Sequence, residues 1–407
     1  MLWSLSKWKQ QLAKGILIRF ILGLLFIYIY CEYLIYYVTQ IQCDWPQLNN
    51  EPSNVEPVRA MVLADTHLLG SRNGQWLDKW RREWQMHRAF QTAMTLQRPE
   101  VVFVLGDLFD EGKWCPEKEF EDYVERFHKL FQVPPETKMF VVVGNHDIGF
   151  HYSDMLEYVL METRELDNFP RITPHLASRF EKKLSAPPVQ LISIRGNHFV
   201  LINSMAMEGD GCSLCSRAVA EIDKIANILK CSRGSSLCKG ADKVEHYSRP
   251  IIMQHYPLYR HSDSECTEPD AAPLPDRHLR FEERWDCLSK ESTEYLVEKL
   301  LPRAALGGHT HHSCLLRHSF VPTNEHKIEF VEYTVPSFSW RNRLDPKYYL
   351  FTISPDEIKM FKCALPREAT LQVTAILLCI ALLLYLKYYY HCGKTYYTQR
   401  LWSDKKV

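Results

Sequence analysis

Five short polar clusters constrain the fold of this chain more than any other feature of its sequence. Each follows an apolar run or a glycine, and each offers a carboxylate, an amide or an imidazole where a buried strand is expected to end. The clusters are Asp65-Thr66-His67, Gly106-Asp107, Gly144-Asn145-His146-Asp147, Gln254-His255-Tyr256-Pro257 and Gly308-His309-Thr310-His311. A single Asp-x-His or His-x-His pair is more often structural than metal-binding, but five clusters in series predict one shared site.

Two of these clusters place a pair of candidate ligands at positions i and i+2. Asp65 and His67 form one pair, and His309 and His311 form the other. Side chains two residues apart on extended backbone point to the same face. We therefore expect extended backbone at both pairs.

The segments between the clusters alternate between strand and helix patterns. Apolar runs at residues 58–63, 101–105 and 138–143 are followed by helical periodicity at residues 79–97 and 117–131. This alternation predicts an α/β domain with buried strands. In such sheets ligands gather beyond the carboxyl ends of the strands, which is where the clusters fall. Arg195-Gly196-Asn197, between two further apolar runs, predicts a hairpin.

The order D-x-H, G-D-x-x-D, G-N-H-D, H and G-H-x-H across residues 58–352 resembles the calcineurin-like metallophosphoesterase superfamily. The resemblance implies a four-layer α/β-β/α sandwich with a dinuclear metal centre at one sheet edge. By position, Asp65, His67 and His311 would hold one ion, Asn145, His255 and His309 would hold the second, and Asp107 would bridge the two. Mixed imidazole and carboxylate donors suit two divalent ions, with Mn²⁺ expected first and Zn²⁺ or Fe as alternatives.

A two-metal site of this kind predicts hydrolysis of a phosphoester, because paired divalent ions activate water and offset charge developing at phosphorus. His146 is the candidate general acid for the leaving alkoxide, and Asp147 is expected to hold its imidazole in the required tautomer. Asp110 is expected to support the ligands rather than bind metal, and His151 and His312 to be surface or supporting groups. Weaker candidates for substrate contact are Tyr256, Arg260, Trp340 and Arg341.

Two apolar segments flank this domain. Residues 16–38 are long enough to cross a hydrocarbon core of ~30 Å, and residues 371–390 combine a shorter charge-free run with interfacial tyrosines. The alternatives are a signal peptide and a buried core helix, although the first segment lacks a small-residue cleavage site. The expected parts are a tail (1–15), a transmembrane helix (16–38), a linker (39–57), the catalytic domain (58–352), a juxtamembrane segment (353–370), a second transmembrane helix (371–390) and a tail (391–407).

Flanking charge predicts the orientation of these spans. Basic residues precede the first span and follow the second, so both tails are expected in the cytosol and the catalytic domain in a lumen. They are Lys7, Lys9, Lys14, Lys387, Lys394, Arg400, Lys405 and Lys406. The balance of 49 basic and 49 acidic residues argues against nucleic acid as a partner. The dilysine-like Lys405-Lys406-Val407 suggests cycling between endoplasmic reticulum and Golgi.

Cysteine usage agrees with a lumenal domain, because ten of the 13 cysteines lie between the spans and an oxidising compartment favours disulfides. A Cys-rich insert at residues 209–243 contains Cys212-x-x-Cys215, for which a zinc knuckle is the alternative to disulfides. The oxidising lumen favours disulfides there too. The pairing does not follow from the sequence.

The whole order of features, with spans at both ends and a Cys-rich insert, resembles members of the superfamily that act on glycosylphosphatidylinositol (GPI) anchors. That resemblance implies removal of an ethanolamine-phosphate side branch from an anchor mannose, which promotes export of GPI-anchored proteins. The implied partners are those proteins and cargo-receptor or transport machinery. The implied locations are endoplasmic reticulum exit sites, the ER–Golgi intermediate compartment and the cis-Golgi. Two alternatives stay open: a phosphoesterase for another lipid or a nucleotide, and a non-catalytic scaffold, which would be expected to lack ligands.

Overall fold

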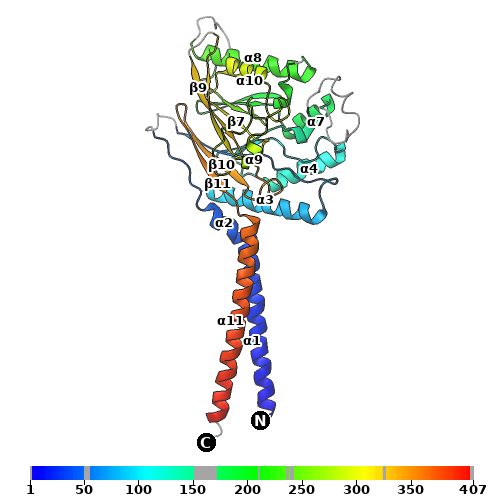
Figure 1. The fold of residues 1–407 in the computed structure, drawn as a ribbon, viewed down its shortest axis with the longest axis vertical. Helices are drawn as coiled ribbons and strands as arrows, with labels where there is room; N and C mark the ends of the chain where they lie inside the picture. The colour runs from blue at the N-terminus through cyan, green and yellow to red at the C-terminus, as the bar shows by residue number, and fades with distance from the viewer. Residues whose placement is uncertain are drawn as a thin grey trace. The chain divides into compact units, whose positions relative to one another are not determined.

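The chain divides into two compact units, one of residues Gln42–Ala364 and one of the terminal stretches Met1–Ile41 and Leu365–Val407. The structure is a computed structural model. It describes residues 2–49, 56–150, 172–209, 211–234, 238, 243–323 and 327–403. The candidate site lies within the first unit, whose fold is set by two β-sheets (Figure 1).

The terminal unit is helical, and its two long helices pack against each other. Its elements are α1 (Leu2–Ile29), the π-helical η1 (Tyr30–Leu34), α2 (Ile35–Gln40) and α11 (Glu368–Ser403). The Arg19 guanidinium lies 3.9 Å from the centroid of the Tyr389 ring. A Cβ atom at Gly23 would overlap the side chain of Leu382, so this glycine allows close approach of the helices.

Two stretches of this unit, Lys7–Gln40 and Glu368–Gln399, are long and apolar enough to cross a membrane, judged by length and composition. Their apolar side chains are exposed: Leu25 is 50% exposed and Leu377 is 60% exposed. The second stretch is therefore not the buried core helix that its length alone would also allow. Membrane spanning itself stays a prediction.

The first sheet has the strand order β11-β10-β1-β2-β3. β1, β2 and β3 run parallel, and β10 and β11 are added antiparallel at one side. The strands are β1 (Val58–Leu63), β2 (Val101–Leu105), β3 (Lys138–Val142), β10 (Lys347–Ile353) and β11 (Ile358–Ala364). All of β2 is buried, as expected for a central parallel strand covered on both faces. The sequence predicted β1, β2 and β3 to within one residue.

The second sheet has the strand order β4-β5-β6-β7-β9-β8. β5, β6, β7 and β9 run parallel. The strands are β4 (Val189–Ile194), β5 (Asn197–Ile202), β6 (Ile251–Met253), β7 (Ala304–Gly307), β8 (Cys314–Phe320) and β9 (Ile328–Thr334). The predicted hairpin is confirmed between β4 and β5, where Arg195 and Gly196 have φ values of 46° and 75°.

Apolar side chains from both sheets form one core, in which the rings of Phe103 on β2 and Phe199 on β5 lie 4.9 Å apart. Helices lie on both sides of the strands (Figure 1). They are α3 (Trp76–Gln97), α4 (Glu117–Leu130), α5 (Asn145–Ile148), α7 (Pro174–Leu184), the 3₁₀ turn η3 (Ser204–Ala206), α8 (Ser213–Ser232), α9 (Leu274–Arg277) and α10 (Lys290–Leu300). The α/β class is confirmed, and the finer four-layer description stays a prediction.

The limits of the catalytic unit differ from those predicted. The expected linker at residues 39–57 contacts the folded unit, because the Trp45 indole donates to the carbonyl of Gln97 at 3.0 Å. At the other end, β11 lies beyond the expected domain end at residue 352. It belongs to the domain because it pairs with β10 along its whole length.

Four disulfides fasten this unit, and they involve eight of its ten cysteines. The pairs are Cys43–Cys363, Cys212–Cys215, Cys231–Cys238 and Cys266–Cys314. Cys115 and Cys287 are buried and are not disulfide-bonded. In the Cys-rich insert the structure thus shows disulfides rather than the alternative zinc knuckle.

Candidate metal centre

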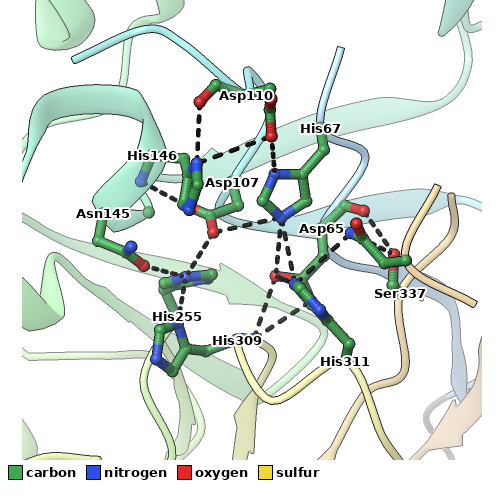
Figure 2. Close-up of polar contacts among 12 residues, drawn as sticks. Asp65, His67, Asp107, Asp110, Asn145, His146, His255, His309, His311 and Ser337 are labelled. Atoms are coloured by element: carbon green, nitrogen blue, oxygen red, sulfur yellow. Dashed lines mark hydrogen bonds and ion pairs between the residues drawn. The ribbon is translucent and has the colours of Figure 1, made fainter. Parts of the chain in front are cut away.

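The candidate site forms where parallel strands of both sheets end (Figure 2). Asp65, Asp107 and Asn145 follow β1, β2 and β3 of the first sheet. His255 and His309 follow β6 and β7 of the second sheet. The first sheet therefore contributes carboxylate and amide oxygens together with the His67 imidazole, and the second sheet contributes imidazoles.

The first group of side chains is Asp65, His67 and His311. The Nε2 atoms of His67 and His311 lie 3.2 Å apart, and Nε2 of His311 lies 3.8 Å from Oδ1 of Asp65. One candidate ligand atom from each residue lies within 4.8 Å of the other two. The structure thus brings together the three residues predicted for one ion.

The second group is Asn145, His255 and His309. Nε2 of His255 lies 3.0 Å from Oδ1 of Asn145 and 3.3 Å from Nδ1 of His309. His255 is completely buried. These are the three residues predicted for the second ion, and their role as ligands stays a prediction.

Asp107 lies between the two groups. Its Oδ2 atom is 3.4 Å from Nε2 of His67 and 3.3 Å from Nε2 of His255. Its other oxygen, Oδ1, accepts the backbone N–H of His146 at 2.8 Å. This is the placement that a bridging carboxylate requires.

The backbone at the site adopts left-handed conformations. In the described residues, ten non-glycine positions have positive φ, and five of them are candidate ligands: Asp65 (55°), His67 (43°), Asp107 (48°), His309 (72°) and His311 (60°). The expected extended backbone at the two i, i+2 pairs is therefore wrong. Such positions cost on the order of 1–3 kcal/mol each and are typical of functional sites. Hydrogen bonds between the loops hold them, such as that from the N–H of His67 to the carbonyl of Asp107 at 2.9 Å.

The outer nitrogens of the histidines are bonded to oxygen acceptors. Nδ1 of His255 donates to the carbonyl of Leu105 at 2.8 Å, and Nε2 of His309 donates to the carbonyl of Trp285 at 2.7 Å. A carbonyl only accepts, so these contacts place the proton on the outer nitrogen of each neutral ring. When both rings are neutral, the inner nitrogens carry lone pairs that a cation between them would bind. Without a cation, burial of the His255 ring opposes its protonation, but the neighbouring Asp107 carboxylate outweighs this effect and raises the pKa of His255 to about 9.

The carboxylates of the site also fit bound cations. Asp65 is completely buried, and this burial raises its pKa to about 7. Burial also opposes ionisation of Asp107, but the surrounding His255, His146 and His67 rings outweigh it and hold the pKa of Asp107 well below its usual range. A buried charge is costly unless it is paired or binds metal. The donor set therefore fits divalent cations.

A family model described as calcineurin-like phosphoesterase matches residues 58–313. The chain belongs to the calcineurin-like phosphoesterase family. Curated relatives named metallophosphoesterase 1 are similar over most of their length. The Danio rerio protein is 42% identical over 362 residues, which cover 88% of each chain, and the Cricetulus griseus protein is 42% identical over 401 residues, which cover 94% of this chain and 95% of the relative.

A solved purple acid phosphatase from yellow lupin (Lupinus luteus) also resembles the chain, with a TM-score of 0.43 and 12% sequence identity. It covers 78% of this chain and 52% of its own, and a similarity of this size supports no inference. The calcineurin-like phosphoesterase fold implies a dinuclear divalent metal centre, and the His and Asp clusters described above match it. The chain is a metal-dependent phosphoesterase.

His146 lies at the rim of this phosphoesterase site, but the predicted pairing of its ring with Asp147 is wrong. Nδ1 of His146 donates instead to the main-chain carbonyl of Asp110 at 2.8 Å. The Asp147 carboxylate accepts the backbone N–H groups of Gly144 at 2.8 Å and Phe109 at 3.0 Å. Asp147 therefore holds the loops that carry Asn145 and Asp107. The tautomer of His146 is set by a carbonyl, which leaves Nε2 for other contacts.

Asp110 contacts the His67 ring, and it also forms a candidate metal-binding group with His67 and His146, so its supporting role stays a prediction. Its Oδ1 atom lies 3.1 Å from Nδ1 of His67. Its Oδ2 atom accepts from Asn73 at 3.2 Å and from Arg341 at 3.1 Å. Burial alone would raise the pKa of Asp110. The hydrogen bond to the His67 ring and the positive charge of Arg341 outweigh this effect and lower the pKa of Asp110 to about 2. An ionised Asp110 thus orients His67 and gathers basic groups at the rim.

The four predicted substrate contacts occupy different surroundings. Tyr256, Arg260 and Trp340 are buried. The Arg260 guanidinium already donates to the carboxylate of Asp263 at 2.9 Å. The Arg341 side chain is 30% exposed, so its placement is the most compatible with substrate contact. His312 lies against Arg343, and His151 lies outside the described residues.

Lys113 is a functional candidate that the sequence reasoning missed. Its side chain is buried, with Nζ over the rings of Trp114 at 4.6 Å and Phe150 at 5.2 Å. Its backbone N–H donates to the carbonyl of His146 at 3.0 Å. Burial lowers the pKa of Lys113. Within the described residues no carboxylate forms an ion pair with Lys113. The sequence signal that could have found it is a lysine three residues after the G-D-x-x-D motif.

Proposed function

We propose that this chain is a membrane-anchored, lumenal phosphodiesterase that removes an ethanolamine-phosphate side branch from a mannose of GPI anchors. Removal would promote export of GPI-anchored proteins from the endoplasmic reticulum. The observation that carries the proposal is the presence, on one chain, of a phosphoesterase site and two flanking helices apolar enough to span a bilayer. The choice of this glycolipid comes from the resemblance of the whole sequence described above.

Two observations support a lumenal orientation. Basic residues lie on the outer flank of both apolar helices, which favours tails in the cytosol. Eight of the ten cysteines between the helices form disulfides, which are rare in the reducing cytosol. We place the protein in membranes of the early secretory pathway, where GPI-anchored proteins and transport machinery would be its partners.

When bound, two divalent ions would lower the pKa of water and polarise the phosphoryl oxygens. Mixed nitrogen and oxygen donors suit Mn²⁺, Zn²⁺ and Fe, and we take Mn²⁺ as the first candidate. In hydrolysis of the side branch, the water oxygen bonds to phosphorus and the bond from phosphorus to the mannose oxygen breaks. The protonated His146 ring would give its Nε2 proton to that oxygen, and the proton released by the attacking water would go to solvent. The products are ethanolamine phosphate and a free mannose hydroxyl.

His146 is positioned for this proton transfer by its bond to the Asp110 carbonyl. Burial lowers the pKa of His146 to about 4, so the ring is neutral at pH 7 before substrate binds. An anionic phosphodiester next to the ring favours the protonated form. Lys113, buried among aromatic rings on the same side, would hold a non-bridging phosphate oxygen.

The deciding experiment compares the masses of GPI anchors from cells with and without the chain. Cells without it are expected to retain one more ethanolamine phosphate, and wild-type protein, but not a His146→Ala variant, should remove it. An unchanged count would overturn the substrate and favour another lipid or a nucleotide. Hydrolysis of an aryl phosphodiester by the purified full chain with Mn²⁺ tests the enzyme separately, and its absence would favour a scaffold.

A further inference from the structure

The first turns of α3 expose three large apolar side chains on one face. Trp76 is 79% exposed, Leu77 is 56% exposed and Trp80 is 58% exposed. Positions i and i+4 are neighbours on one side of a helix, and at 3.6 residues per turn position i+1 lies within an arc of about 100° that includes both. Two exposed tryptophans beside a leucine form a contiguous patch, which on a soluble surface marks an interaction site. The later part of α3 is different, because its apolar residues are buried in the domain.

The N-terminal end of α3 adjoins the metal centre. Just before the helix, Asn73 donates to Oδ2 of Asp110, the carboxylate that also contacts His67. The backbone N–H groups of Arg72 and Asn73 donate to the buried carboxylate of Glu111 at 3.0 Å and 2.6 Å. Trp76, the first residue of the patch, is therefore three positions after Asn73, whose side chain contacts Asp110 beside the metal centre.

The C-terminal end of α3 adjoins the segment that leads to the first apolar helix. Gln97 donates from Nε2 to the carbonyl of Cys43 at 2.8 Å, and Trp45 donates to the carbonyl of Gln97. Cys43 is three residues beyond Gln40, the last residue of the first candidate span. At 1.5 Å per residue, the 22 residues of α3 cover roughly 33 Å. α3 thus extends from the segment around Cys43 to the edge of the metal centre.

The chemistry of the patch fits a phospholipid surface. Tryptophan is enriched at the boundary between the hydrocarbon and the headgroups. Residues 71–82 contain four basic residues, Arg72, Lys79, Arg81 and Arg82, against a single acidic one, Asp78. Such an excess complements lipid phosphates. Two apolar helices on the same chain would keep a bilayer at high effective concentration, which makes even a small contact surface useful.

We infer that Trp76, Leu77 and Trp80 form a lipid-contact face that holds the catalytic unit against the bilayer, with the rim of the metal centre at headgroup level. The inference rests on the membrane anchoring in the proposed function. Such a face would favour phosphodiesters attached to the membrane over soluble ones. It would act on substrate encounter and would leave the chemistry of the site unchanged.

A crosslinking experiment on the full chain tests the face directly. The chain is reconstituted in vesicles of phosphatidylcholine and phosphatidylserine, with a benzophenone amino acid replacing either Trp76 or Trp80. The matched control replaces Val321, which is 70% exposed on the turn between β8 and β9. We expect phospholipid adducts by mass spectrometry at positions 76 and 80, at about tenfold the yield at position 321. Equal yields at all three positions, or adducts to protein at 76 and 80, would overturn the inference.

A kinetic experiment separates this face from the proposed activity. A Trp76→Ser/Trp80→Ser variant is expected to raise KM for a vesicle-embedded phosphodiester about tenfold and to leave hydrolysis of a soluble aryl phosphodiester unchanged. A Leu274→Ser/Val321→Ser variant should match wild type on both substrates. Equal KM for the vesicle substrate in wild type and the tryptophan variant would sink the lipid face. Lipid adducts without any hydrolysis would instead count against the proposed function and leave the face standing.

Discussion

The inner nitrogens of His255 and His309 lie 3.3 Å apart, and the outer nitrogen of each ring donates to a main-chain carbonyl. When both rings are neutral, imidazoles held in this way direct their lone pairs toward each other. A cation between the rings would bind both lone pairs, so metal binding and folding are coupled at this site.

Removal of divalent ions should lower the stability of the folded chain. An ion that binds only the native state adds about 2.7 kcal/mol to the unfolding free energy at 100 times its Kd. We expect chelation to lower the thermal midpoint of the full chain and Mn²⁺ to restore it. A His255→Ala/His309→Ala variant should respond much less to the ion. An identical midpoint with and without chelator would contradict the metal centre.

Asp107→Asn should reduce the metal content more than Asp65→Asn. Oδ2 of Asp107 lies near both histidine groups, at 3.4 Å from His67 and 3.3 Å from His255, whereas Asp65 serves one group. Elemental analysis of purified chains is expected to show about two ions in wild type, about one in Asp65→Asn and fewer in Asp107→Asn. Asp122→Asn, on the exposed side of α4, should retain both. Equal losses in the two site variants would argue against a bridging role.

The strands and the order of the ligands followed from local patterns. Asp65 and Asp107 come directly after the apolar runs that became β1 and β2, and parallel neighbours bring their ends together. His255 and His309 follow the same rule in the second sheet. Each of these predictions needed only a buried strand followed by a polar residue, and such short-range signals are the most dependable in a sequence.

The contacts that orient the ligands did not follow from the sequence, because they join distant segments. The Trp285 carbonyl that fixes His309 belongs to an irregular loop, and Arg341 reaches Asp110 across 231 positions of the chain. Asp147 was assigned to the adjacent His146, yet its carboxylate bonds to backbone N–H groups, one of them from the loop after β2. Sequence proximity suggested the wrong partner because the loop conformation decides which groups meet.

His146→Ala should slow hydrolysis according to the leaving group. A general acid matters most for a poor leaving group, so we expect a loss of about 10²–10⁴-fold with an alkyl phosphodiester. A nitrophenolate needs little protonation, and the loss with the corresponding aryl diester should be much smaller. Metal content should stay at the wild-type value. Equal losses on both substrates would assign His146 to binding rather than to proton transfer.

Gly144→Ala should disrupt the site although the residue has an ordinary negative φ of −112°. A Cβ atom at Gly144 would overlap the backbone nitrogen and a carboxylate oxygen of Asp107. Overpacking of this kind typically costs about 1–3 kcal/mol. We expect a lower thermal midpoint and reduced metal content. Gly234→Ala is the control, because its φ of +93° carries a backbone cost while, among the residues that the structure describes, no atom lies within 4 Å of the added Cβ. If the Gly144→Ala chain were as stable as wild type, the loops that carry Asp107 and Asn145 could move apart without loss of stability, and the prediction would be wrong.

Lys113→Met should weaken binding of the phosphate group while the metal centre stays intact. Nζ of Lys113 lies over Trp114 and Phe150. A charge-assisted hydrogen bond contributes about 1.5–3 kcal/mol, so KM for an aryl phosphodiester is expected to rise by about 10- to 100-fold. Inhibition by vanadate should weaken in parallel. Methionine keeps the length and the apolar packing of the side chain.

Two further variants isolate the charge at this position. Lys113→Arg should recover part of the vanadate affinity, because it restores a cation between the same rings. Lys118→Met, on the exposed surface of α4, removes one positive charge from the same part of the chain and should leave KM unchanged. A Lys113→Met chain with wild-type KM and vanadate affinity would mean that the buried ammonium serves the packing of the aromatic rings alone. A parallel loss of metal content would instead show that Lys113 supports the ligand loops, because the methionine variant preserves everything else about the side chain.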